Sequence, residues 1–145
     1  MRQWSHRIAT LAVVLVASPL LASCGGASNA PQSGGFAVAV KERDFKIVMP
    51  GHLSAGTHVL AVHNEGPVDR ELIAIRLGKG RLPLRRDGIT LDEDALEPAE
   101  AGALEPGAPG ATRNVTLRLK PGRYEFVCNM AGHYLSGMHK TVQVG

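Results

Sequence analysis

Three side chains with soft or borderline metal-ligand atoms lie close together near the C-terminus. Cys128, His133 and Met138 supply a thiol, an imidazole and a thioether within the segment YEFVCNMAGHYLSGM. Gly132 and Gly137 directly precede two of them, and glycine allows the tight turns by which one loop can direct several side chains to one point. The spacing therefore predicts a metal site built largely from a single loop.

The ligand types favour copper. Magnesium, calcium and manganese prefer oxygen ligands, whereas a thiolate with histidine and a weak axial methionine is the arrangement of blue-copper electron-transfer sites. Zinc would need a fourth good ligand, and methionine is a poor one. We therefore expect one copper ion, with Cys128, His133 and Met138 as metal ligands.

Short strands must position this loop, because apolar residues alternate with a period of two through much of the chain after residue 35. Tyr124, Phe126 and Cys128 share one face of a strand, which directs the sulfur toward the core. The predicted strands cover residues 36–40, 45–49, 57–63, 72–77, 115–119, 124–128 and 141–144. Short strands with regular turns and little helix predict an all-β sandwich over residues 36–145.

The alternation is lost between residues 78 and 110. This segment begins with basic residues, continues with acidic ones, and is rich in Pro and Gly. We expect a long charged loop, with at most a turn or two of helix between Leu91 and Leu104, because Pro98 and Gly102 limit its length. A functional loop and a solvated connection are both open.

The pattern C-x4-H-x4-M, preceded by Y-x-F-x and followed by an apolar last strand, resembles the C-terminal ligand loop of the cupredoxins, the plastocyanin, rusticyanin and sulfocyanin group. The resemblance covers residues 36–145 in layout and implies a Greek-key β-sandwich of seven to eight strands. It implies that Cys128 is the thiolate ligand of a type 1 copper site, His133 its loop histidine and Met138 its axial thioether. A second histidine is implied at the start of an earlier strand.

Arg70 stands where the resemblance places that second histidine, in the stretch HNEGPVDRELI over residues 63–73. A guanidinium keeps its proton at physiological pH and has no lone pair to donate, so Arg70 cannot bind a metal ion. The expected type 1 copper site is therefore one histidine short.

Three outcomes are open. Another histidine could replace the missing ligand, although each candidate is more often a surface residue; the candidates are His52, His58, His63 and His139. Alternatively, the three loop ligands could form a site that prefers Cu(I), with help from Met130, because soft ligands and low coordination number favour the reduced ion. Finally, the site could be lost, with Arg70 paired to Asp69, Glu71 or a Cys128 thiolate.

These outcomes imply different functions. With copper, we expect electron transfer or copper handling and a redox or copper-handling protein as partner. Without it, we expect a scaffold that acts as a non-metal binding or interaction module. We expect no enzyme, because no Asn or Asp at a recognisable spacing orients a Cys–His pair. We expect a monomer.

The first residues have the pattern of an export signal. Arg2 and Arg7 precede an apolar run from Ile8 to Ala22, shorter than the roughly 20 residues of a membrane span. Leu21-Ala22-Ser23-Cys24 resembles a bacterial lipobox, so we expect a signal peptide over 1–23, a lipidated Cys24 and a flexible tether over 24–35. The mature protein would be extracytoplasmic and anchored to a membrane.

Loss of that signal peptide changes the charge and the thiol content of the chain. The 16 Lys and Arg and 13 Asp and Glu of the full chain become 14 and 13. This near-neutral balance argues against a nucleic-acid partner. Cys128 would be the only free thiol of the mature chain, so no intramolecular disulfide is expected.

Overall fold

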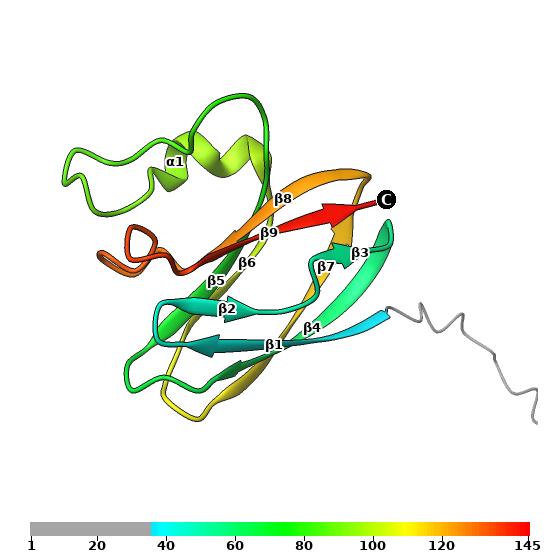
Figure 1. Ribbon diagram of the computed structural model, residues 1–145, viewed down its shortest axis with the longest axis horizontal. Coiled ribbons are helices and arrows are strands. Elements are labelled where there is room, and N and C mark those ends of the chain that lie inside the picture. The colour runs from blue at the N-terminus through cyan, green and yellow to red at the C-terminus, as the bar shows by residue number, and fades with distance from the viewer. Residues whose placement is uncertain (1–35) are drawn as a thin grey trace, which may run out of the picture. The chain divides into compact units, whose positions relative to one another are not determined.

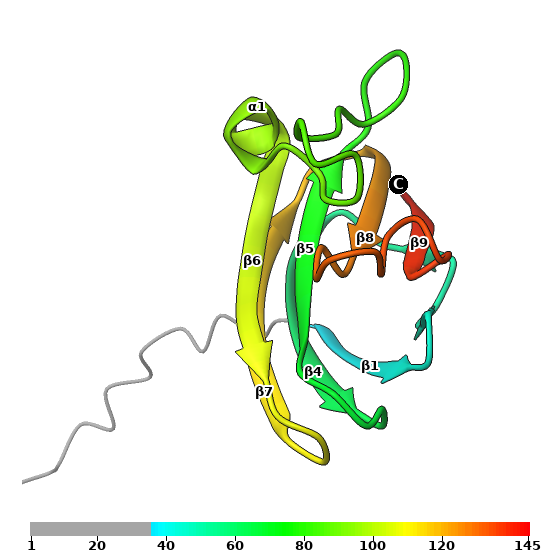
Figure 2. The same cartoon turned by 90° about the vertical axis from the view of Figure 1, so that its left-hand side faces the viewer.

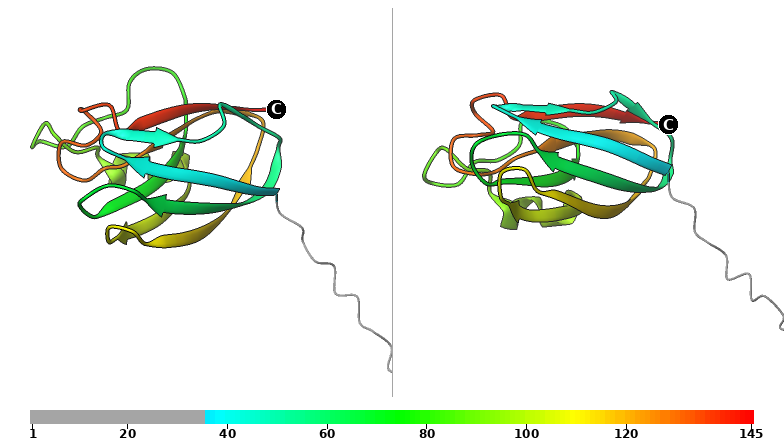
Figure 3. Two further views of the ribbon diagram at one scale, coloured as in Figure 1. Left: turned by 60° about the horizontal axis from the view of Figure 1, so that its bottom comes forward. Right: turned by 90° about the horizontal axis from the view of Figure 1, so that it is seen from below.

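The computed structural model describes residues 36–145, which form two β-sheets packed face to face (Figures 1 and 3). One sheet has the order β2-β1-β4-β7, where the strands are β1 (Phe36–Arg43), β2 (Lys46–Val48), β4 (Gly56–Asn64) and β7 (Thr112–Leu119). The other has the order β3-β9-β8-β5-β6, with β3 (His52–Leu53), β5 (Arg70–Arg76), β6 (Glu100–Gly107), β8 (Gly122–Val127) and β9 (His139–Val144). The predicted all-β sandwich is confirmed.

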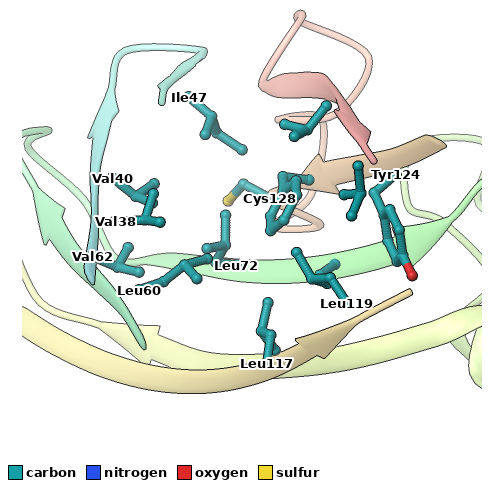
Figure 4. Packing of buried hydrophobic residues seen from close by; sticks show 14 of the residues in the cluster. Val38, Val40, Ile47, Leu60, Val62, Leu72, Leu117, Leu119, Tyr124 and Cys128 are labelled. Carbon is teal, nitrogen blue, oxygen red and sulfur yellow. The ribbon is translucent and has the colours of Figure 1, made fainter. Parts of the chain in front are cut away.

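Period-two alternation explains the main core. Inward side chains of both sheets form one buried cluster that includes Val40, Leu60, Leu72 and Phe126. Figure 4 shows Cys128 among these inward-facing residues. The sulfur therefore lies at the interior of the sandwich, as the shared face of Tyr124, Phe126 and Cys128 predicts.

Residues 36–145 form nine strands, more than the seven to eight predicted. β3 is only two residues long, too short for alternation to reveal. β6 lies in the segment expected to be a charged loop, and it forms because β5 offers an edge to pair with. Gly102 in β6 allows β7 to approach closely, because a β-carbon there would lie 2.6 Å from Leu117 Cδ2.

Residues 78–99, which we call the excursion, pack against the outer face of the second sheet (Figure 2). Its Leu91 and Leu96 are buried against Ile73, Ile75 and Val127, which point away from the main core. The excursion contains α1 (Glu93–Leu96), which Asp92 caps by accepting a hydrogen bond from Ala95 N, and a 3₁₀ turn over Glu97–Ala99. The helical turns expected here are confirmed, and the excursion is largely exposed but fixed to the sheet by two buried leucines.

Asn129 joins the excursion to the loop that carries the predicted ligands. Its side chain accepts a hydrogen bond from Leu91 N at 2.5 Å and donates to Leu91 O at 3.2 Å and to Glu93 Oε1 at 2.6 Å. Gly132 N also donates to Ile89 O. The excursion therefore supports the outer side of that loop.

Among the described residues, the two cores draw on residues 38–144, and a segment with its own hydrophobic core is expected to fold as a unit. No helix in the described part is long and apolar enough to cross a membrane. The predicted signal peptide, the tether over residues 24–35 and the lipidated Cys24 lie outside the described residues.

The second core supplies a test of the excursion's role. Leu91→Ala should lower the free energy of unfolding by about 2 to 4 kcal/mol, because Leu91 is fully buried. Leu84→Ala is the matched control, since Leu84 lies in the same segment and is 41% exposed, so its effect should be small. Equal effects in urea unfolding would contradict a packed excursion.

Candidate metal centre

The loop from Cys128 to Met138 is closed by backbone hydrogen bonds. Cys128 N donates to Met138 O at 3.1 Å, and Met138 N donates to His133 O at 3.0 Å. Gly132 and Gly137 have φ values of 79° and 97°, a region that favours glycine, so the turns expected at these positions are present. The loop therefore returns to its starting point and brings its two ends together.

The three predicted ligands meet at the inner side of this loop. Cys128 Sγ lies 3.4 Å from His133 Nδ1, and Cys128 and Met138 are fully buried. His133 is partly exposed and contacts the ring of Phe45 edge-on, with 5.5 Å between ring centroids. The predicted strand over residues 45–49 begins one residue too early, because Phe45 lies in the β1–β2 turn at φ 51°, where the chain reverses, and is 48% exposed.

The guanidinium of Arg70 contacts two of these ligands, His133 and Met138. Its Nη1 donates a hydrogen bond to Met138 Sδ at 3.1 Å and lies 3.4 Å from His133 Nδ1. Arg70 is 1% exposed, at the start of β5, with the inward parity of Leu72. The register implied by the cupredoxin resemblance thus places residue 70 at the centre, and the side chain there is a cation.

Asp44 is the carboxylate that pairs with Arg70. Its Oδ1 accepts a hydrogen bond from Arg70 Nη2 at 2.9 Å, and its side chain is 71% exposed. The partners expected from the sequence, Asp69, Glu71 and a Cys128 thiolate, are wrong: Asp69 is exposed and Arg70 points inward, away from its sequence neighbours. Asp44 lies in the β1–β2 turn, and no motif in the sequence indicates that this turn contacts the start of β5.

Gly66 makes room for the guanidinium. A β-carbon at this position would lie 2.3 Å from Arg70 Nε and Nη2, a distance that no side chain could occupy. The turn is held by Asn64, whose Oδ1 accepts a hydrogen bond from Gly66 N and whose Nδ2 donates to Val68 O and Gly107 O. The turn before β5 is therefore shaped around the arginine.

No other histidine replaces the missing ligand in the described part of the chain. His58 and His63 hydrogen-bond to Ser54 O and Thr112 Oγ1, and His139 pairs with Glu125. His52 is exposed in β3. Met130 packs at the margin of the main core, and no group of three or more His, Cys, Asp or Glu residues in 36–145 could hold a metal ion.

The surroundings of the ligands shift two of their pKa values. Burial raises the pKa of the Cys128 thiol, which disfavours the free thiolate. Burial and the charge of Arg70 lower the pKa of His133, which favours the neutral imidazole, the form that can bind a metal ion. The obstacle to copper is therefore Arg70 itself, because its guanidinium lies against His133 and Met138 and has no lone pair to donate, so the residues as arranged do not fit copper.

A second ion pair, largely buried, joins β1 and β7. Glu42 is fully buried, and its Oε2 accepts a hydrogen bond from Arg113 Nη2 at 2.9 Å, while its Oε1 has no partner. Burial raises the pKa of Glu42 to about 7, although the charges of Arg113 and Arg70 lower it. The sequence analysis missed Glu42, although its parity with Val38 and Val40 in β1 could have placed it inside.

Solved structures with the same fold are blue copper proteins or carry the names of that group. Auracyanin A, described as a "blue" copper protein from Chloroflexus aurantiacus, is 17% identical with a TM-score of 0.58, covering 77% of this chain and 100% of its own. Reduced auracyanin from Roseiflexus castenholzii is 16% identical with a TM-score of 0.56, and the match covers 77% of this chain and 98% of that protein. Rusticyanin from Thiobacillus ferrooxidans is 14% identical with a TM-score of 0.57, and the match covers 77% of this chain and 79% of that protein.

These likenesses establish the cupredoxin fold. No protein-family model and no curated protein sequence matches the chain. The fold expected from the loop pattern is thus confirmed, while the metal content of this chain is a separate question.

The buried Glu42 predicts a pH-dependent stability. A carboxyl whose pKa is raised on folding holds its proton more tightly in the folded state, so the free energy of unfolding falls as pH rises from about 4.5 through about 7. Glu42→Gln should flatten this decline in urea unfolding between pH 5 and 8.

Glu65→Gln is the control for that measurement. Hydrogen bonds from Lys41 and Arg43 lower the pKa of exposed Glu65, so its titration lies below this pH range and the slope should not change. A wild-type slope in Glu42→Gln would mean that another group causes the decline.

Proposed function

We propose that this cupredoxin-fold domain is a membrane-anchored, extracytoplasmic binding module in which Arg70 takes the place of copper. The supporting observation is the position of the guanidinium, with Nη1 at 3.1 Å from Met138 Sδ and 3.4 Å from His133 Nδ1. Electron transfer, expected from the cupredoxin resemblance, requires a copper centre at that position.

The surroundings of Arg70 support a permanent role for the arginine. A buried guanidinium needs acceptors and a compensating charge; Asp44, His133 and Met138 supply them to its two terminal nitrogens, whereas its Nε has no partner among the described residues. Gly66 removes the side chain that would collide with it. These features indicate that the residues around Arg70 accommodate the arginine as a structural part of the site.

Copper(I) holding is the second candidate. The observation in its favour is that His133 Nδ1 lies 3.4 Å from Cys128 Sγ and that His133 and Met138 contact the same guanidinium nitrogen; such soft ligands suit the reduced ion. Arg70 would have to leave, and its carboxylate partner Asp44 is largely exposed at the surface. With this function, the domain would be a copper-handling protein, and its partner would be another copper-handling protein.

The remaining expectations belong to the same proposal. The chain would be held to a membrane through the lipidated Cys24 and the tether over residues 24–35, as a monomer without enzymatic activity or a nucleic-acid partner. The near-neutral mature chain supports the last of these points. A binding module of this kind acts through a ligand or a partner within reach of its tether.

Copper titration tests the central proposal. A domain that begins after Cys24 should bind neither Cu(II) nor, under reductant, Cu(I) with one-to-one stoichiometry, and its visible spectrum should stay colourless. Arg70→His should gain Cu(II) affinity and an intense blue thiolate band, because it restores the imidazole. Adding Cys128→Ser to Arg70→His should abolish that band.

Arg76→His is the matched control, because Arg76 lies at the exposed far end of the same strand. A blue band in the wild-type domain would overturn the proposal. Tight, colourless binding of Cu(I) would instead favour the second candidate.

The membrane anchor has its own test. In a bacterial host supplied with labelled palmitate, the full chain should become labelled and enter the membrane fraction. Cys24→Ser should abolish both, whereas Cys128→Ser, which changes the other of the two cysteines, should change neither. Label retained in Cys24→Ser would show that the lipobox assignment is wrong.

A further inference from the structure

A cavity of about 300 Å³ lies on the outer side of the ligand loop, away from Arg70. It is lined by residues of the excursion on one side and of the loop and β9 on the other: Arg81, Leu82, Leu84, Tyr134, Leu135 and His139. This volume is at the lower end of the range for small-molecule sites. Leu84 and Leu135 are 41% and 53% exposed, so large apolar side chains stand open to solvent around it.

The walls of this cavity are held by hydrogen bonds within the domain. On the excursion side, Arg85 N donates to Thr90 O and Asp92 N to Pro83 O, on either side of Leu84. Asn129 then binds both backbone groups of Leu91. The cavity is therefore formed before any ligand arrives, which lowers the entropic cost of binding.

Two polar groups of the cavity are placed for recognition. Arg81 makes no hydrogen bond or ion pair with any residue of 36–145, so its charge is available. His139 Nδ1 is bound to Glu125 Oε1 at 2.6 Å, and Glu125 also accepts a hydrogen bond from Thr141. This contact fixes the imidazole and leaves its other nitrogen for the cavity, beside the ring of Tyr134 at 5.2 Å between centroids.

The charges around the cavity favour a ligand with a negative group. Arg81 is the arginine of the lining, no carboxylate is among the lining residues, and Glu125, which holds His139, is largely buried. A single arginine among leucines suits one carboxylate on an apolar body. A phosphate would want more donors than these side chains provide.

We propose that this cavity binds a small aromatic or aliphatic carboxylate. Arg81 pairs with the carboxylate, His139 and Tyr134 contact its polar edge, and Leu82, Leu84 and Leu135 cover its apolar body. The proposal goes beyond the binding-module function and does not depend on the metal content of the centre. Because Tyr134 follows His133 and His139 follows Met138, a bound ligand would touch the same loop from the opposite side.

Benzoate is a suitable probe, followed by ¹H–¹⁵N NMR of the domain that begins after Cys24. Saturable shifts should appear at the amides of Arg81, Tyr134, Leu135 and His139. Arg81→Gln should weaken benzoate binding about tenfold, the loss expected for one charge-assisted contact. Benzyl alcohol, which has the same ring without the charge, should bind more weakly than benzoate to the wild type and be little affected by Arg81→Gln.

Arg86→Gln is the matched control, because Arg86 is an exposed arginine of the same excursion that does not line the cavity. Equal loss of affinity in both variants would overturn the proposal, since it would show only a general effect of charge. Absence of saturable shifts at the cavity, or benzyl alcohol binding as tightly as benzoate, would also overturn it. Repeating the titration with Arg70→His separates this site from the centre, because benzoate affinity should not change there.

Discussion

The buried charge of Arg70 is the constraint around which the centre of the domain is arranged. A guanidinium removed from water must find acceptors and a compensating charge. Asp44 supplies the charge from the β1–β2 turn, Met138 supplies an acceptor from the ligand loop, and Gly66 supplies space from the turn before β5. One side chain thereby joins three segments that are far apart in the sequence, and its removal would take away the donor that His133 and Met138 share.

The alternation of β8 continues into the loop and divides its contacts between two sides. Cys128 points into the sandwich, where it meets His133, whereas its neighbour Asn129 points outward and binds Leu91 of the excursion. The loop is therefore held from within by the arginine centre and from without by the second core. This two-sided support explains why the outer cavity and the inner centre share a wall without sharing residues.

Much of the fold could be predicted from the residues alone. Alternation located the main strands and placed Cys128 inside, and the resemblance of the loop indicated the cupredoxin fold. β6 escaped prediction because its Ala, Gly and Pro residues carry little apolar pattern, and it depends on β5 for pairing. The second core escaped for a related reason: Ile73, Ile75 and Val127 looked like ordinary strand residues, and only the excursion folded against them shows why both faces of these strands are apolar.

Short-range spacing was enough to identify the residues of the loop that could lie together, because glycine turns control where one loop directs its side chains. Residue 70 could likewise be excluded as a ligand from its type alone, because a guanidinium has no lone pair. Neither spacing nor residue type indicated that Arg70 lies beside His133 and Met138 rather than in solvent, or that Asp44 is its partner. A buried charge is stabilised by neighbours in space, and those neighbours come from strands whose pairing no local pattern records.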